Sequence, residues 1–265
     1  MSQRHGVVSA FVKKVDPDQG RVKVEYRSID EQLQSTWAPI ASPMSGKKRG
    51  AFFMPEEGDE VLMAFGDAQF DTPYVVGFLW NGEQTSPDSS VHNRVIVTPG
   101  NHTLRFEDKD GDKRIILKSD GGHSITLEDK PPGKHIEIKS TQHTVTLDDQ
   151  AGSANITLSA GGGVVTVALK TTPPSVEVTT PTGTVKLDTS GITIEAATSV
   201  TINSAGTTQI NCTTATLTAA TTTLNTGMLA VNAALTTFAG AVQCTALIAN
   251  AVSSPLYTPG IGNLI

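Results

Sequence analysis

The chain has 265 residues, a formal net charge of −6, 38% hydrophobic residues and 5% aromatic residues. Its apolar content suffices for one sizeable core or two modest ones, and its negative charge gives no general electrostatic basis for binding nucleic acid or anionic lipid. Cys212 and Cys244 are too few for a disulfide scaffold and lack metal-site spacing. No stretch is apolar enough for a transmembrane helix and the first residues show no signal-peptide pattern, so we expect assembly in the cytosol.

Charged residues thin out along the chain and predict its domains. Residues 1–90 hold 22 charged residues, residues 91–150 hold 19, and residues 151–265 hold five, of which Glu195 is the last. With the repeats described below, this predicts an N-terminal domain over 1–90, a repeat over 91–195, a charge-free segment over 196–252 and a C-terminal tip over 253–265.

The N-terminal domain is predicted to be a small closed β-barrel. Alternating apolar and polar residues predict strands over 6–15, 20–26, 59–66 and 73–80, each bounded by turn residues. No convincing helical period is present. About five short strands in a domain of this size favour closure, because a closed sheet leaves no exposed edge.

A repeat follows, in which a short strand carries two apolar residues separated by one polar residue. From Leu127 to Leu187 the second apolar residue recurs at steps that alternate between 11 and 9, a period of 20. Turn residues fill the longer gaps. The alternation places apolar residues on one face and Thr on the other. Each unit is therefore either a pair of stacked steps or a hairpin.

After Leu187 the step shortens to 7 or 8 residues and continues to Phe238. Such a strand buries little alone, and it is short for one coil of a single-chain solenoid. It fits a prism of three chains in which each chain crosses one face per step. We therefore predict an all-β chain with an intertwined trimeric β-helix needle.

Residues 20–87 carry an ordered set of short motifs: Gly20–Val24 (GRVKV), Trp37-Ala38-Pro39, Gly50–Pro55 (GAFFMP), Gly58–Leu62 (GDEVL) and Tyr74–Gly77 (YVVG). Together they resemble the N-terminal OB-fold of baseplate assembly protein V, a family that also includes the VgrG spikes of type VI secretion. The β-repeat and the ending PLYTPGIGNLI are similar to that family too.

The resemblance implies an OB-fold collar followed by a β-helical needle, in a non-enzymatic homotrimer that is seated on a baseplate hub protein. It implies a central spike that crosses a target membrane when a sheath contracts, in a phage tail, a tailocin or a related injection system, assembled in the bacterial cytoplasm. Some relatives end in a His-x-His that binds iron. This chain has no His after His143, so we expect no metal and no cofactor.

The C-terminus breaks the repeat, with Pro255 and Pro259 opposing strand pairing. Relatives in injection systems carry a PAAR-repeat tip protein at this place. We expect the same kind of partner here, or a tip that closes on itself. The expected tip-binding residues are Leu256, Tyr257, Pro259, Gly260, Ile261, Leu264 and Ile265.

Several clusters could carry chemistry, and each has a plainer interpretation. Asp108, Asp110 and Asp112 lack the EF-hand position of Gly, so a hairpin turn is favoured. The PEEGDE stretch, 55–60, reads as a turn before a strand. His123 and His143 share the face of the apolar residues, where they either fill a widened segment or form rings on a trimer axis. Cys212 shares the parity of Ile210, which predicts a buried thiol.

Three other function classes remain open on the sequence. An OB-fold can bind single-stranded nucleic acid on aromatic side chains, although residues 1–90 hold nine basic against thirteen acidic residues. A tailspike-like glycan-binding or glycan-degrading protein is also a trimeric β-helix, and as an enzyme it needs two placed carboxylates. A Thr-rich ice-binding solenoid would need unbroken Thr columns. The aromatic candidates for base stacking are Trp37, Phe52, Phe53, Phe65 and Tyr74.

Overall fold

The computed structural model describes residues 6–29 and 33–250. The chain divides into two compact units, with the boundary between Ile202 and Asn203. Every regular element in the described residues is a strand apart from two single-turn 3₁₀ segments, Gly66–Ala68 and Gly161–Gly163. The prediction of an all-β chain is therefore confirmed. The described part of the chain contains no helix of the length and apolarity that a bilayer span requires.

The N-terminal sheet has the strand order β3-β2-β1-β6-β7. A parallel bridge between Ile40 and Val75 joins its two ends, so the five strands close on themselves in the topology of the OB-fold. A separate two-stranded hairpin, β4–β5, belongs to the same region. The strands are β1 (Val8–Asp16), β2 (Arg21–Glu25), β3 (Ala38–Pro39), β4 (Ser45–Gly46), β5 (Arg49–Gly50), β6 (Glu60–Phe65) and β7 (Pro73–Phe78).

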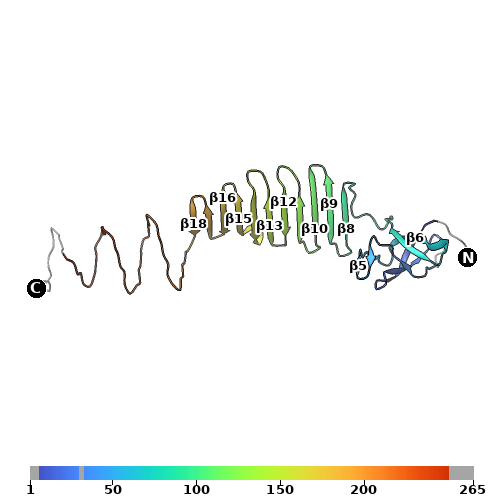
Figure 1. Ribbon diagram of the computed structural model, residues 1–265, viewed down its shortest axis with the longest axis horizontal. Coiled ribbons are helices and arrows are strands. Elements are labelled where there is room, and N and C mark those ends of the chain that lie inside the picture. The colour runs from blue at the N-terminus through green and yellow to red at the C-terminus, as the bar shows by residue number, and fades with distance from the viewer. Residues whose placement is uncertain (1–5, 30–32, 251–265) are drawn as a thin grey trace. The chain divides into compact units, whose positions relative to one another are not determined.

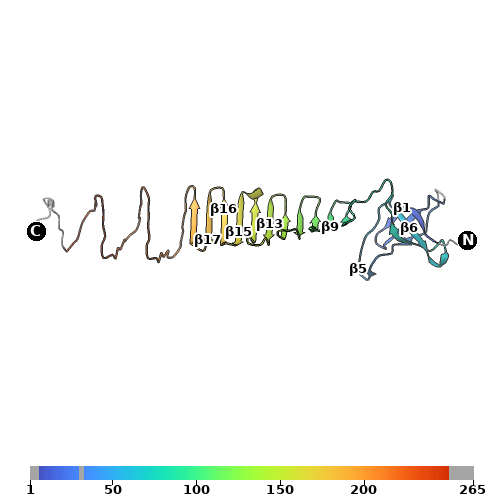
Figure 2. The same ribbon diagram turned by 90° about the horizontal axis from the view of Figure 1, so that it is seen from above.

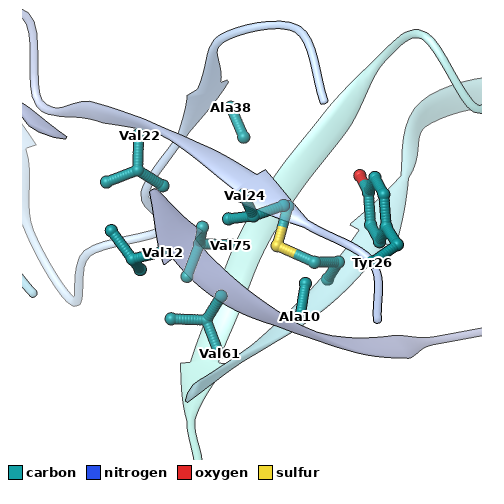
Figure 3. Packing of buried hydrophobic residues seen from close by; sticks show 9 residues of the cluster. Ala10, Val12, Val22, Val24, Tyr26, Ala38, Val61 and Val75 are labelled. Atoms are coloured by element: carbon teal, nitrogen blue, oxygen red, sulfur yellow. The ribbon is translucent and has the colours of Figure 1, made fainter. Parts of the chain in front are cut away.

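The core of this domain follows from alternation along its strands. In β2, Val22 and Val24 are fully buried while Arg21 and Lys23 face outward. Tyr26 stacks obliquely against Phe70 at 4.8 Å between ring centroids, and burial raises its pKa to about 12. Figure 3 shows the cluster, which consists of Ala10, Val12, Val22, Val24, Tyr26, Ala38, Val61, Met63 and Val75.

The second sheet contains eleven antiparallel strands that follow one another in chain order, β8 to β18 (Figure 1). The 20-residue units are thus hairpins rather than pairs of stacked steps. The strands are β8 (Asn93–Val97), β9 (Thr103–Lys109), β10 (Asp112–Lys118), β11 (Ser124–Glu128), β12 (His135–Lys139), β13 (His143–Asp148), β14 (Asn155–Ala160), β15 (Val165–Thr171), β16 (Pro174–Thr180), β17 (Gly183–Asp188) and β18 (Gly191–Ala196).

Turn chemistry closes these hairpins. Lys109 pairs with Asp112 across a two-residue loop, Asp110-Gly111, and Gly111 has φ +77°. A positive φ is what an Asp-Gly hairpin turn requires and what glycine adopts without steric cost. The predicted hairpin at Asp108, Asp110 and Asp112 is therefore confirmed.

The core of the N-terminal domain yields a direct test. We expect Met63→Ala to lower the free energy of unfolding of this domain by about 2–5 kcal/mol, because Met63 is fully buried and its truncation leaves a cavity. Met44→Ala is the matched control: Met44 is 57% exposed, so its loss should cost under about 0.5 kcal/mol. Hydrogen exchange of the β1, β2 and β6 amides in the full chain measures both. Equal losses would contradict the core assignment.

Candidate functional site

One face of the long sheet carries two continuous columns of apolar side chains. The register aligns them strand by strand: Leu127 lies opposite Ile136, and Ile125 opposite Ile138. The same pairing continues through every hairpin to β18, where Leu187 lies opposite Ile192. Figure 2 shows the stacked strands from above. The columns consist of Leu104, Phe106, Ile115, Leu117, Ile125, Leu127, Ile136, Ile138, Val145, Leu147, Ile156, Leu158, Val167, Leu169, Val176, Val178, Val185, Leu187, Ile192 and Ile194.

We call this surface the apolar face, and no described part of the chain covers it. Leu117 is 51% exposed, Leu187 49% and Ile192 71%. The whole chain exposes 20843 Å², whereas a compact monomer of 27.8 kDa exposes about 11,000 Å². The irregular residues from 203 to 250 contribute to this excess together with the apolar face. The apolar face itself is contiguous exposed apolar surface, which marks an interface.

The opposite face of the sheet is mostly polar, and several of its charges form ion pairs. Arg114 reaches Glu128 at 3.1 Å and Asp112 at 2.6 Å, and Lys170 reaches Glu177 at 3.1 Å. The hydrogen bond from Lys170 lowers the pKa of Glu177. In the same way the hydrogen bond from Lys186 lowers the pKa of Asp188. Thr side chains occupy most of the remaining positions, so this face suits solvent.

The histidines singled out by the sequence lie where the hairpins turn. His123 directly precedes β11, and His143 is the first residue of β13. Both follow the parity of the apolar columns, as predicted, but they sit at the ends of the strands rather than at the middle. Among the described residues no cluster of three or more His, Cys, Asp or Glu side chains could hold a metal ion.

The PEEGDE stretch forms the predicted turn before β6. The amide N–H of Glu56 donates to Asp59 Oδ2 at 2.8 Å, and the Asp59 N–H donates back to the Glu56 carbonyl at 3.2 Å. Glu60 accepts a hydrogen bond from Asn81 at 2.9 Å. These carboxylates are used to hold the turn and the neighbouring loop.

From Asn203 to Asn250 the chain has no regular strand, and all of these residues are exposed. Ile210 is 79% exposed and Leu217 75%. Cys212 is exposed as well in the single chain; its burial near the axis of three chains stays a prediction. The predicted tip residues, Leu256, Tyr257, Pro259, Gly260, Ile261, Leu264 and Ile265, lie outside the described residues.

Aromatic residues of the OB-fold divide between its core and its surface. Phe65 packs against the core, so it offers no platform for a base. Trp37 lies beneath two cations, Arg21 at 4.9 Å and Lys23 at 5.2 Å from the ring centroid. Phe53 and Phe78 line an open groove of about 440 Å³ that also includes Trp80. Sequence alternation alone did not single out this groove, because it joins β7 to the loop before β6.

Known proteins resemble the chain in its N-terminal part. Residues 4–80 match the type VI secretion system/phage-baseplate injector OB domain. The spike protein VgrG1b of Pseudomonas aeruginosa is 28% identical over 116 residues, covering 38% of this chain and 16% of the relative. VgrG5 of the same organism is 33% identical over 112 residues (37% and 14%), and VgrG3 of Vibrio cholerae is 28% identical over 110 residues (37% and 11%).

The chain thus matches less than a fifth of the length of these relatives. The match falls on the closed five-stranded sheet whose topology is that of an OB-fold. Residues 4–80 therefore match the injector OB domain in both sequence and topology, and the chain resembles the baseplate spike proteins of the VgrG type.

Proposed function

We propose that this chain is the central spike of a contractile injection machine, a non-enzymatic homotrimer that pierces a target membrane. The observation that carries the proposal is the apolar face, which runs through ten consecutive strands and is left uncovered by the residues that the structure describes. Burial of such a surface in copies of the same chain removes it from water and stabilises the assembly.

The dimensions of the strands support three copies. A strand of about six residues is about 20 Å long. Three such strands arranged as a triangle place each sheet about 6 Å from the axis, close to half of the roughly 10 Å at which facing sheets pack. Four copies would leave a hollow axis. The polar face, with its paired charges and Thr, then points to solvent on all three sides.

The charge-free segment supports the same arrangement. Its apolar residues recur every 7 or 8 positions, and none of the described residues from 203 to 250 forms a strand with its own chain. Backbone N–H and C=O groups need partners when they are buried. Neighbouring copies can supply these partners at each step, in an intertwined β-helix over 196–252.

The proposed function implies three partners: a baseplate hub protein for the collar, a PAAR-like tip protein at residues 253–265, and a target membrane during contraction.

Two alternative functions are weaker. Nucleic-acid binding is disfavoured because Phe65 is taken up by the core, and the OB domain carries more acidic than basic residues. Glycan cleavage is disfavoured because Glu107, Glu128 and Glu177 are engaged in ion pairs.

A pair of adjacent residues tests the trimer. Leu158→Asp should abolish the trimer in sedimentation or light scattering, because it places a carboxylate from each copy in an apolar interior at a cost of several kcal/mol. Thr157→Asp is the matched control on the polar face and should leave the trimer intact. A stable folded monomer of the unaltered chain at micromolar concentration would overturn the proposal.

A second prediction concerns the absence of charge after Glu195. A charged side chain near the bilayer centre costs about 2.5–3.5 kcal/mol, and a trimer carries each charge three times. Lys at Thr201, Thr218 and Thr223 should therefore leave the trimer folded but reduce delivery by particles that carry it. Undiminished delivery would show that membrane passage does not require the charge-free segment.

A third prediction concerns the proposed tip-binding residues. Deletion of 256–265 should leave a soluble trimer that no longer retains a small tip protein in pull-downs from particle lysate, because the apolar residues that would bind it are gone. The full-length chain is the control. Images of intact particles in which density ends at Ile265 would contradict a separate tip protein.

A further inference from the structure

Three strands of the long sheet share one pattern that the described remainder of the sheet lacks. The sequences are HTLRFED at His102–Asp108, HSITLED at His123–Asp129 and HTVTLDD at His143–Asp149. Each has a histidine, two apolar residues and an aspartate at alternate positions. Because side chains alternate between faces, all four point to the apolar face. Histidine thus marks one end of β9, β11 and β13, and aspartate marks the other.

The backbone holds the three histidines in the same way. The amide N–H of each donates to a hydroxyl that opens its turn: Thr98 for His102 at 3.1 Å, Ser119 for His123 at 3.1 Å and Ser140 for His143 at 3.0 Å. The carbonyl of each histidine accepts the N–H of that same Thr or Ser. The three side chains therefore lie in register along the side of the sheet where β9, β11 and β13 begin. We call this row of strand ends the histidine edge.

The aspartates are held with equal regularity. The amide N–H of Asp108 donates to the carbonyl of His92, that of Asp129 to Lys113 and that of Asp149 to Lys134, at 3.1, 2.9 and 2.9 Å. They form the aspartate edge of the sheet. Arg94 lies 3.9 Å from Asp108 and Lys134 lies 3.7 Å from Asp129, and all four of these side chains are at least 60% exposed.

The two edges cannot satisfy each other within one chain. Six residues of extended strand separate each histidine from its aspartate by about 20 Å. No described carboxylate lies within ion-pair distance of the three histidines. His102 Nδ1 accepts the amide N–H of Asp120 at 3.3 Å, and His143 Nδ1 lies 3.3 Å from Ser140 Oγ. Between His123 and His143 an open groove of about 420 Å³ is lined also by Ser119, Lys139 and Ser140.

Cyclic symmetry brings the two edges together. In a trimer whose threefold axis runs parallel to the direction in which the strands stack, the copies follow one another head to tail around the axis. The start of β11 in one copy then meets the end of β11 in the next copy. The triangle has its corners at the strand ends, where His123 and Asp129 lie, and its axis beside the strand middles. The imidazole N–H is a donor and the carboxylate an acceptor, so the chemistry at each corner is complementary.

We propose that His102, His123 and His143 bind Asp108, Asp129 and Asp149 of the next copy, and that these nine corner pairs fix the register of the three chains. The inference rests on the proposed trimer. The partner of this surface is a second copy of the same chain. Later strands carry Val165 and Thr171, or Gly183 and Thr189, at the equivalent positions. A shift by one hairpin leaves those later strands equally well matched but removes one of the three His–Asp pairs at each corner, so the corner pairs favour the unshifted register.

Disulfide trapping tests the geometry. In a chain with Cys212→Ala and Cys244→Ala, the double variant His123→Cys/Asp129→Cys should give a covalent trimer on a non-reducing gel after mild oxidation. The two positions are too far apart for a bond within one chain, because a disulfide requires Cα atoms within about 7 Å. The control His123→Cys/Asp149→Cys is displaced by two strands, about 10 Å, and should remain uncrosslinked.

The outcomes separate this inference from the proposed function. A trimer in light scattering that fails to crosslink at 123/129, or that crosslinks at 123/149 instead, overturns the corner pairs and leaves the trimer standing. A monomeric parent chain overturns both.

A charge exchange tests the chemistry at the corners. Changing His102, His123 and His143 to Asp places like charges together and should lower the melting temperature of the trimer. Adding Asp108→His, Asp129→His and Asp149→His should restore the melting temperature, because each corner again holds one histidine and one aspartate. If the second set of changes does not restore the melting temperature, the histidines and aspartates lie near each other without binding, and the proposed corner pairs are wrong.

Discussion

The structure depends on one constraint: a long sheet has an apolar face that no described part of the chain covers. Each hairpin satisfies its backbone locally, and its polar face pairs its charges. The two apolar columns have no partner among the described residues. The N-terminal OB domain differs in this respect, because its five strands close and bury Val22, Val24 and Met63 completely. One part of the chain therefore folds around its own core, while the long sheet leaves its apolar face exposed in the single chain.

The charges follow this division. In the OB domain and the first hairpins, ion pairs such as Arg114–Glu128 occupy the polar face. Further along, Lys170–Glu177 and Lys186–Asp188 are the ion pairs that the described residues retain. Thr replaces them, which keeps a hydroxylated surface while removing the cost of stripping water from ions. The proposed spike would have to be rigid, and hydrogen-bonded strands with hydroxyl groups on the outer face meet that need.

Sequence patterns predicted much of this. Alternation located the strands and their buried residues, and the order of the GRVKV, GAFFMP and YVVG motifs predicted the OB-fold to which residues 4–80 are matched. The period of 20 left hairpins and stacked steps equally open, because both place the same residues on one face. The groove at Phe53, Phe78 and Trp80 depends on tertiary contact and has no sequence period. The sequence assigned the histidines to the correct face. Only the observed strand ends show that a row of aspartates lies at the other ends of the same strands.

The change from hairpins to short steps has a consequence for the order of folding. Pairings from β8 to β18 join neighbours in the chain, and such local contacts form quickly because little loop entropy is lost. From Asn203 onward no described residue pairs with its own chain in this way. In the proposed trimer that segment pairs only with other chains, so its rate of formation rises with protein concentration, whereas the hairpins form at a rate set by one molecule alone. Synthesis from the N-terminus thus delivers the self-sufficient parts first and the dependent part last, which shortens the time that the exposed Ile and Leu of the last segment spend without partners.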